Sequence, residues 1–153
     1  MQTHFTPQRA LHCRGVALFM YEYAPIVGLD AREAALCGWL HDFGYLFGDN
    51  RTFAESCGLL LEHVGYQNRN RVFRHGTPQG LGTPLGVLLN IADMWVSPQR
   101  ECIGFDARLA DVADRYGAES PQAKECSIMV SALRKTHEWK LLAPVLGKPY
   151  SAE

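Results

Sequence analysis

The chain consists of long amphipathic stretches, in which apolar and polar residues are mixed, separated by short breaks of glycine, proline and small polar residues. Within each stretch the apolar residues recur at helical spacing, and no run alternates in the manner of a β-strand rich in β-branched residues. The pattern therefore predicts an all-α fold. We expect helices near residues 7–24, 31–46, 53–64, 67–75, 84–96, 106–116 and 121–139.

Two kinds of capping signal mark where these helices start. A hydroxyl residue precedes a proline, which is favoured at the first helical position, at Thr6, Thr83 and Ser120. Asp30 with Glu33, and Thr52 with Glu55, have the spacing of a capping box, in which each side chain satisfies a backbone donor of the other. These signals agree with the periodicity on where the helices begin.

The chain shows no internal repeat, low-complexity tract or break in composition that would separate two domains. We therefore expect one domain over residues 1–142, folded as a single bundle of about six to seven helices. The glycine- and proline-rich stretch from Ala143 to Pro149 predicts a loop, so that residues 143–153 form a C-terminal tail.

Composition narrows the classes of function. Fifteen Lys and Arg against sixteen Asp and Glu give a formal charge of -1, which argues against general nucleic-acid binding and fits a small or phosphorylated ligand better. No apolar stretch approaches the roughly 20 residues that cross a bilayer, and residues 1–9 lack the pattern of a secretory signal. We expect no membrane association and a cytoplasmic location. The five cysteines form no CxxC pair, so we expect reduced core residues.

The most informative candidate residues are His41 and Asp42, which follow each other within an apolar run. Burying such a pair without partners is costly. Adjacent helical side chains diverge by about 100°, yet both can turn toward one ion, and imidazole with carboxylate suits a divalent metal. Ala34, Ala35 and Gly38 in the preceding turn are small enough to let another helix approach closely.

Two other helices offer further ligands. His12 lies near the start of the first expected helix. In the stretch 84–96, Leu85, Leu89 and Asp93 follow one another at i, i+4 spacing, so an apolar stripe ends in a carboxylate. Taken singly, each has an ordinary alternative, since a histidine is often a satisfied core or surface residue and a buried aspartate often pairs with arginine. Together they predict a metal site without thiolate ligands.

The residues from Arg9 to His12, the run 34–44 that contains His41-Asp42, and the run 88–94 that ends with Asp93-Met94 resemble the HD-domain superfamily of metal-dependent phosphohydrolases. The superfamily is named for its H…HD…D metal ligands. The resemblance covers roughly Arg9 to Trp95 and implies a single-domain HD-domain helical bundle. It implies the metal ligands His12, His41, Asp42 and Asp93.

The resemblance also bears on the number of metals. Dinuclear members carry two further histidines, and His75 before Gly76 looks like the second of them. Ala54 stands where the first would be expected, so we expect one divalent metal rather than two. The mixed nitrogen and oxygen ligands admit Mn, Fe, Ni, Co, Mg or Zn. Di-iron HD proteins that use dioxygen need more histidines than this chain offers.

We therefore expect a metal-dependent phosphohydrolase, either a phosphomonoesterase or a phosphodiesterase, that acts on a small phosphorylated substrate such as a nucleotide through a metal-activated water. Asp42 and His75 are the candidate catalytic residues, for orienting water and for moving a proton or stabilising charge. The candidate phosphate-binding residues are Arg9, Arg71 and Arg74, although a solvated basic face would explain the last two equally well. The alternative is a non-catalytic metal- or nucleotide-binding regulatory module, and a homo-oligomer remains open.

Overall fold

The computed structural model describes residues 6–42, 78–96 and 103–146. These ranges form a single bundle of six α-helices and contain no β-strand, which confirms the all-α prediction. The helices are α1 (Pro7–Tyr23), α2 (Ala31–Leu40), α5 (Pro84–Trp95), α6 (Phe105–Tyr116), α7 (Pro121–Arg134) and α8 (His137–Leu146), with 3₁₀ turns at Ala24–Val27 and Pro78–Gly82. The helices expected near 53–64 and 67–75 lie outside the described residues.

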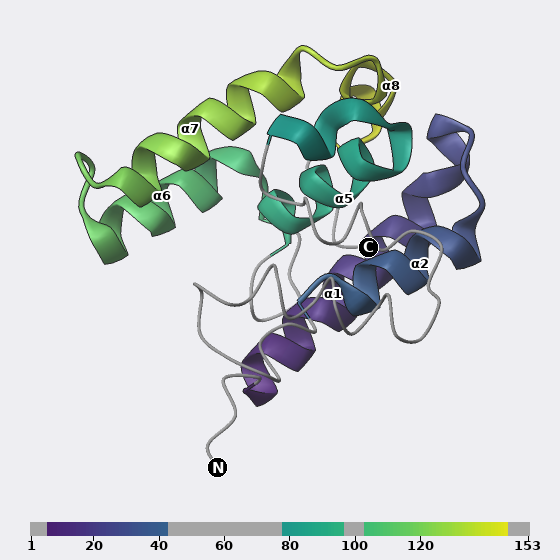
Figure 1. The fold of residues 1–153 in the computed structure, drawn as a ribbon, viewed down its shortest axis with the longest axis horizontal. Helices are drawn as coiled ribbons and strands as arrows, with labels where there is room; N and C mark the ends of the chain where they lie inside the picture. The colour runs from purple at the N-terminus through teal and green to yellow at the C-terminus, as the bar shows by residue number, and fades with distance from the viewer. Residues whose placement is uncertain (1–5, 43–77, 97–102, 147–153) are drawn as a thin grey trace, which may run out of the picture.

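Helix α5 is the centre of the bundle. It contacts α1 and α2 on one side and α6, α7 and α8 on the other, as Figure 1 shows. Every residue from Leu85 to Ala92 is buried, so this helix is enclosed all round rather than along one stripe. The predicted stripe of Leu85 and Leu89 is therefore confirmed as core, and it leads to Asp93 in the last turn.

The predicted helix starts are confirmed wherever they fall within the described residues. The Thr6, Thr83 and Ser120 side chains each accept a hydrogen bond from the backbone N–H three residues later. Asp30 accepts one from the Glu33 N–H at 2.8 Å. Each bond satisfies a donor that the first helical turn would otherwise leave without a partner. The expected start at Thr52 lies outside the described residues.

Helices α1 and α2 pack closely because small residues line the seam between them. Ala34 is fully buried, and a Cβ placed on Gly38 would lie 2.9 Å from both the Cα and the backbone nitrogen of Ala17. The backbones are therefore too near each other for any side chain at position 38. This confirms that small residues let another helix approach, and the contact holds the end of α2 against α1 at Ala17, just past the middle of that helix.

Two helix ends differ from the prediction. Helix α2 ends at Leu40 rather than near residue 46, so His41 and Asp42 lie in the turn that follows it. The His41 ring bonds the Gly38 carbonyl, which would receive the Asp42 N–H if the helix continued.

The expected helix 121–139 is two helices. The Thr136 hydroxyl accepts the Trp139 N–H and donates to the Leu133 carbonyl, so it caps a new helix immediately after α7 ends. Helix α8 continues through Pro144 to Leu146, and residues 143–146 are therefore helical rather than part of a loop or tail.

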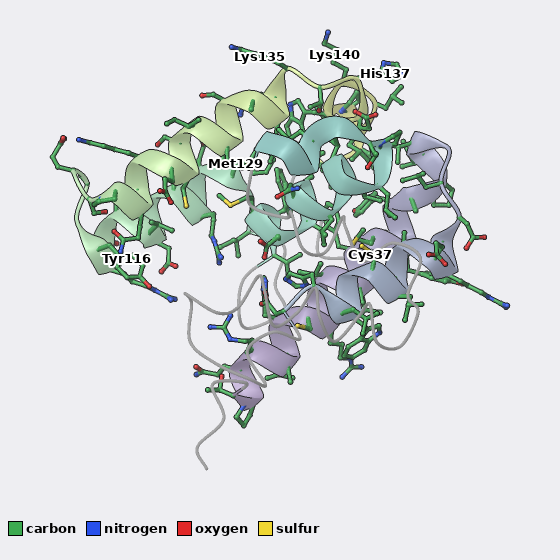
Figure 2. The ribbon with its side chains drawn as sticks, viewed as in Figure 1. Cys37, Tyr116, Met129, Lys135, His137 and Lys140 are labelled. Carbon is green, nitrogen blue, oxygen red and sulfur yellow. The ribbon has the colours of Figure 1, made fainter. Side chains whose placement is uncertain are left out.

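The C-terminal helices are attached to α5 through aromatic rings. Trp95 lies 5.1 Å from Phe105 and 5.7 Å from Trp139 between ring centroids, and Phe105 and Trp139 are 4.8 Å apart. Figure 2 shows Lys135, His137 and Lys140 pointing outward where α7 ends and α8 begins. Among the helices that the structure describes, none has the length and apolar character needed to cross a bilayer.

The contact at Gly38 predicts a large cost for a small substitution. We expect Gly38→Ala to lower the free energy of unfolding by roughly 1–3 kcal/mol, because its methyl group would meet the Ala17 backbone, which cannot move aside without separating the helices. Urea unfolding followed by circular dichroism measures this. Gly82→Ala is the matched control, since a Cβ there meets nothing within 4 Å. Equal stability of the two variants would contradict the close seam.

Candidate metal centre

The four predicted ligands come together where the first half of α1 meets the ends of α2 and α5. His12 lies in the second turn of α1, His41 and Asp42 directly follow α2, and Asp93 lies in the last turn of α5. These three helices contact one another pairwise. Sequence positions as far apart as 12 and 93 therefore contribute to one site.

Two imidazole rings converge on one carboxylate oxygen. His12 Nε2 lies 2.8 Å and His41 Nε2 lies 3.3 Å from Asp93 Oδ1. The rings meet edge to face with their centroids 5.3 Å apart. One ligand atom from each of the three residues falls within 4.8 Å of the others, which brings two nitrogen ligands and one oxygen ligand into one small volume. This group could hold a metal ion.

The backbone determines which nitrogen of His41 faces the site. Its Nδ1 lies 2.6 Å from the Gly38 carbonyl oxygen, which can only accept, so Nδ1 carries the proton and donates it. Nε2 then points at Asp93 Oδ1 and at Asp42 Oδ2, 3.5 Å away. A neutral ring in this orientation would place its lone pair against two anionic oxygens, so the arrangement requires a proton or a cation between them. Metal-ligating histidines are commonly oriented by such a backbone carbonyl.

Without a metal, the charges of the site depend on one another. Burial lowers the pKa of His41, but the Asp42 charge, the Asp93 hydrogen bond and the Cys13 side chain outweigh it and raise that pKa well above 6.5. Burial raises the pKa of Asp93, and hydrogen bonds from His12 and His41 outweigh it and lower that pKa well below 3.8. The carboxylate is therefore ionised and attracts positive charge at neutral pH.

Asp42 has a second cationic neighbour. Its Oδ2 lies 3.3 Å from Arg9 Nη1, so the guanidinium expected to bind phosphate lies beside the candidate ligands. The Arg9 side chain is 32% exposed while that of Asp42 is 7% exposed, which places the arginine between the carboxylate and solvent. Arg9 therefore offers a partly exposed positive charge directly beside Asp42.

The residues present fit a divalent cation. Two imidazole nitrogens and carboxylate oxygens are the donor set of several divalent metals. His12 Nδ1 is buried and makes no hydrogen bond within the described residues, so Nε2 is the ring nitrogen that the surroundings engage. The C-terminal ends of α2 and α5, whose backbone carbonyls carry partial negative charge, both point toward this position.

One further residue at the centre, Cys13, was not predicted. Cys13 Sγ forms a second compact group with His41 and Asp42, all three of them buried. In the sequence, Cys13 directly follows His12 and begins a row of buried α1 residues that continues with Val16 and Met20.

A third thiol, Cys126 on α7, lies farther along the chain. Burial raises the pKa of the Cys126 thiol, the positive charge of Arg108 on α6 opposes that shift, and the negative charge of Asp93 adds to it. The buried Arg108 Nε has no hydrogen-bond partner within the described residues.

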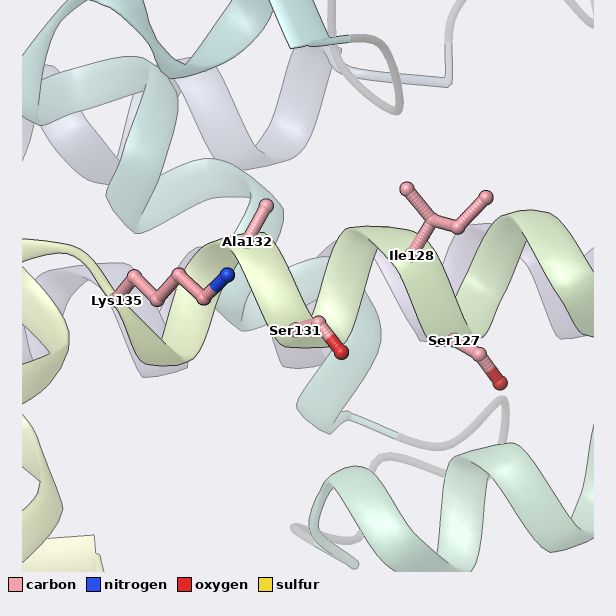
Figure 3. A pocket seen from close by; sticks show the side chains of 5 residues that line it. All are labelled: Ser127, Ile128, Ser131, Ala132 and Lys135. Carbon is pink, nitrogen blue, oxygen red and sulfur yellow. The ribbon is translucent and has the colours of Figure 1, made fainter.

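The remaining predicted site residues are His75, Arg71 and Arg74, which lie outside the described residues. Within the described residues Cys13, Cys37 and Cys126 form no disulfide bond, as expected, and the first two are buried. An open hollow of about 550 Å³ lies elsewhere, along α7, and Figure 3 shows it. It is lined by Ser127, Ile128, Ser131, Ala132 and Lys135. None of the candidate ligands borders it.

Comparison with known proteins adds no assignment: no family model, curated protein or solved structure matches the chain.

The raised pKa of His41 predicts that metal binding releases a proton. Near pH 7 the metal-free ring is protonated, and a cation must displace the Nε2 proton before it binds. We expect about one proton released per bound cation, measured by titration calorimetry with Mn²⁺ in buffers of different ionisation enthalpy. Affinity should rise with pH until the raised pKa is passed and then level off. A binding enthalpy independent of the buffer at pH 7 would contradict this protonation state.

Proposed function

We propose that this protein is a metal-dependent phosphohydrolase of the HD-domain type, which acts on a small phosphorylated compound. The observation that carries the proposal is the convergence of His12 and His41 on Asp93, with Asp42 beside them. The same four residues carry the sequence resemblance. Their spacing across three helices is supported independently by the packing, because the fold brings them together although they are far apart along the chain.

In this proposal His12, His41 and Asp93 hold one divalent cation, with Asp42 as a fourth ligand. When bound, such an ion polarises a phosphoryl oxygen and makes a nearby water more acidic. The protein contributes by fixing the donors before the ion arrives. Gly38 orients His41 through its carbonyl, and the α1–α2 seam keeps His12 opposite it.

Arg9 and Asp42 have linked roles. In the absence of substrate Arg9 neutralises Asp42. An arriving phosphate competes for the guanidinium, which can hold phosphate oxygens in a two-pronged geometry. Asp42 is then freed to accept a hydrogen bond from the attacking water and orient it. Binding of the anion and exposure of the carboxylate are thereby coupled.

Arg71, Arg74 and His75 stay predictions from the sequence, the arginines as phosphate ligands and the histidine as a group that moves a proton. Nucleotides are the first substrate class to screen, since the HD superfamily that the chain resembles handles them.

The ligand assignment predicts the metal content of variants. We expect about one divalent metal per chain in the parent and its loss in Asp93→Ala, which removes the oxygen shared by both imidazoles. Elemental analysis of tag-free protein measures this. Asp114→Ala is the matched control, because Asp114 is exposed on α6 and distant in sequence from the ligands. The control should keep its metal.

The same preparations are then screened for phosphate release from nucleoside monophosphates, cyclic nucleotides and dinucleoside polyphosphates with Mn²⁺ added. Hydrolysis by the parent and not by Asp93→Ala supports the proposal. Full metal content and full hydrolysis in Asp93→Ala would refute it. Stable metal without hydrolysis of any substrate would favour the regulatory module instead.

The proposed role of Arg9 predicts a selective loss. We expect Arg9→Ala to lower kcat/KM for a substrate that the parent cleaves by about tenfold or more, because it removes a charge-assisted bond to phosphate. Metal content should stay unchanged. Arg115→Ala is the control, since Arg115 is exposed and pairs with Asp111. Unaltered steady-state kinetics in Arg9→Ala would remove this arginine from the substrate site.

A further inference from the structure

The second compact group at the metal centre contains a thiol. Cys13 Sγ, a ring nitrogen of His41 and a carboxylate oxygen of Asp42 lie within 4.8 Å of one another. Cys13 is 1%, His41 0% and Asp42 5% exposed, so the three donors share a buried space. In a tetrahedral zinc site, sulfur at about 2.3 Å and nitrogen at about 2.0 Å from the ion are roughly 3.5 Å apart. Only small side-chain movements separate the observed group from that geometry.

His41 belongs to both groups and has one nitrogen to give. Its Nδ1 is engaged with the Gly38 carbonyl, which leaves Nε2 for an ion. The ring can therefore be joined by His12 and Asp93, giving two nitrogens and an oxygen, or by Cys13 and Asp42, giving sulfur, nitrogen and oxygen. The two sets differ in chemical softness, because thiolate favours zinc and similar softer ions while carboxylate suits hard ions such as Mg²⁺ and Mn²⁺.

We propose that Cys13 is a thiolate ligand that gives this centre a second binding mode, with His41 and Asp42, for soft and borderline divalent cations of the zinc and cadmium class. The inference rests on the metal site of the proposed function and extends it to the choice of ion. On binding, the Cys13 S–H bond and the His41 Nε2–H bond both break, the sulfur and the ring nitrogen keep their electron pairs as ligands, and the two protons go to solvent.

This mode would affect turnover. In the proposed function Asp42 is the fourth ligand of an ion held by His12, His41 and Asp93, and a carboxylate that binds through one oxygen keeps the other for orienting water. In the second mode the ion moves toward the Cys13 sulfur and away from His12 and Asp93, so those two residues no longer hold it for the reaction. We therefore expect Cd²⁺ to occupy the centre tightly and to inhibit the Mn²⁺-supported reaction, and Cys13→Ala to relieve that inhibition.

The direct test is titration of metal-free protein with Cd²⁺, followed by the near-ultraviolet absorption of cadmium–thiolate bonds. We expect a band that saturates at about one Cd²⁺ per chain in the parent and is lost in both Cys13→Ser and Cys13→Ala. Cys37→Ala is the matched control, because Cys37 is also a buried thiol and belongs to neither group. It should keep the band. Mn²⁺ affinity, measured by electron spin resonance, should change less than about threefold in the Cys13 variants, since Mn²⁺ does not need sulfur.

The outcomes separate the two proposals. A parent that binds Mn²⁺ but shows no cadmium–thiolate band, or a band that persists in both Cys13 variants, overturns the role of Cys13 and leaves the metal site in place. Failure to bind either ion overturns both. Circular dichroism verifies that each variant is folded. If neither Cys13→Ser nor Cys13→Ala folds, cadmium NMR of the parent and of Cys37→Ala decides. A sulfur ligand shifts the cadmium resonance, so a resonance without that shift refutes the proposal.

Discussion

The charge of Asp93 is the constraint on which this centre depends. Its carboxylate lies among three packed helices, and an ionised carboxylate in such surroundings needs positive charge or hydrogen bonds. Two histidines supply both through a single oxygen atom. The requirement is mutual, because His41 is fully buried and its raised pKa depends on Asp42 and Asp93. Protons on the two imidazoles and a bound divalent cation are therefore two ways of supplying the positive charge that the Asp93 carboxylate needs.

The rest of the bundle serves to keep these groups at fixed separations. Helix α5 is buried along nearly its whole length and carries Asp93 at its end. On its other side α6, α7 and α8 pack against it, and the rings of Trp95, Phe105 and Trp139 join that half of the molecule to the last turn of α5. The carboxylate is thus anchored from one side by aromatic packing and approached from the other by the imidazoles of α1 and α2.

Much of this arrangement could be predicted from the sequence, because its strongest signals are local. Thr6, Thr83 and Ser120 mark helix starts through hydrogen bonds to residues three positions away. The end of α2 and the break before α8 were missed, since each depends on one side chain competing for backbone groups: the His41 ring at Gly38 and the Thr136 hydroxyl at Leu133. His12, His41, Asp42 and Asp93 were found because charge within an apolar pattern is conspicuous. Cys13 was not, because a buried thiol has the same pattern as any small apolar residue.

The seam between Gly38 and Ala17 also determines where α1 and α2 can accept an inserted residue. A residue inserted within α1 between His12 and Ala17 would rotate the imidazole by about 100° relative to the seam and carry it away from Asp93. An insertion between Gly38 and His41 would separate the ring from the carbonyl that orients it. Only five positions along α1 and three along α2 separate each ligand from its contact point in the seam. The number of residues in each of these two short spans is therefore fixed by the geometry of the seam.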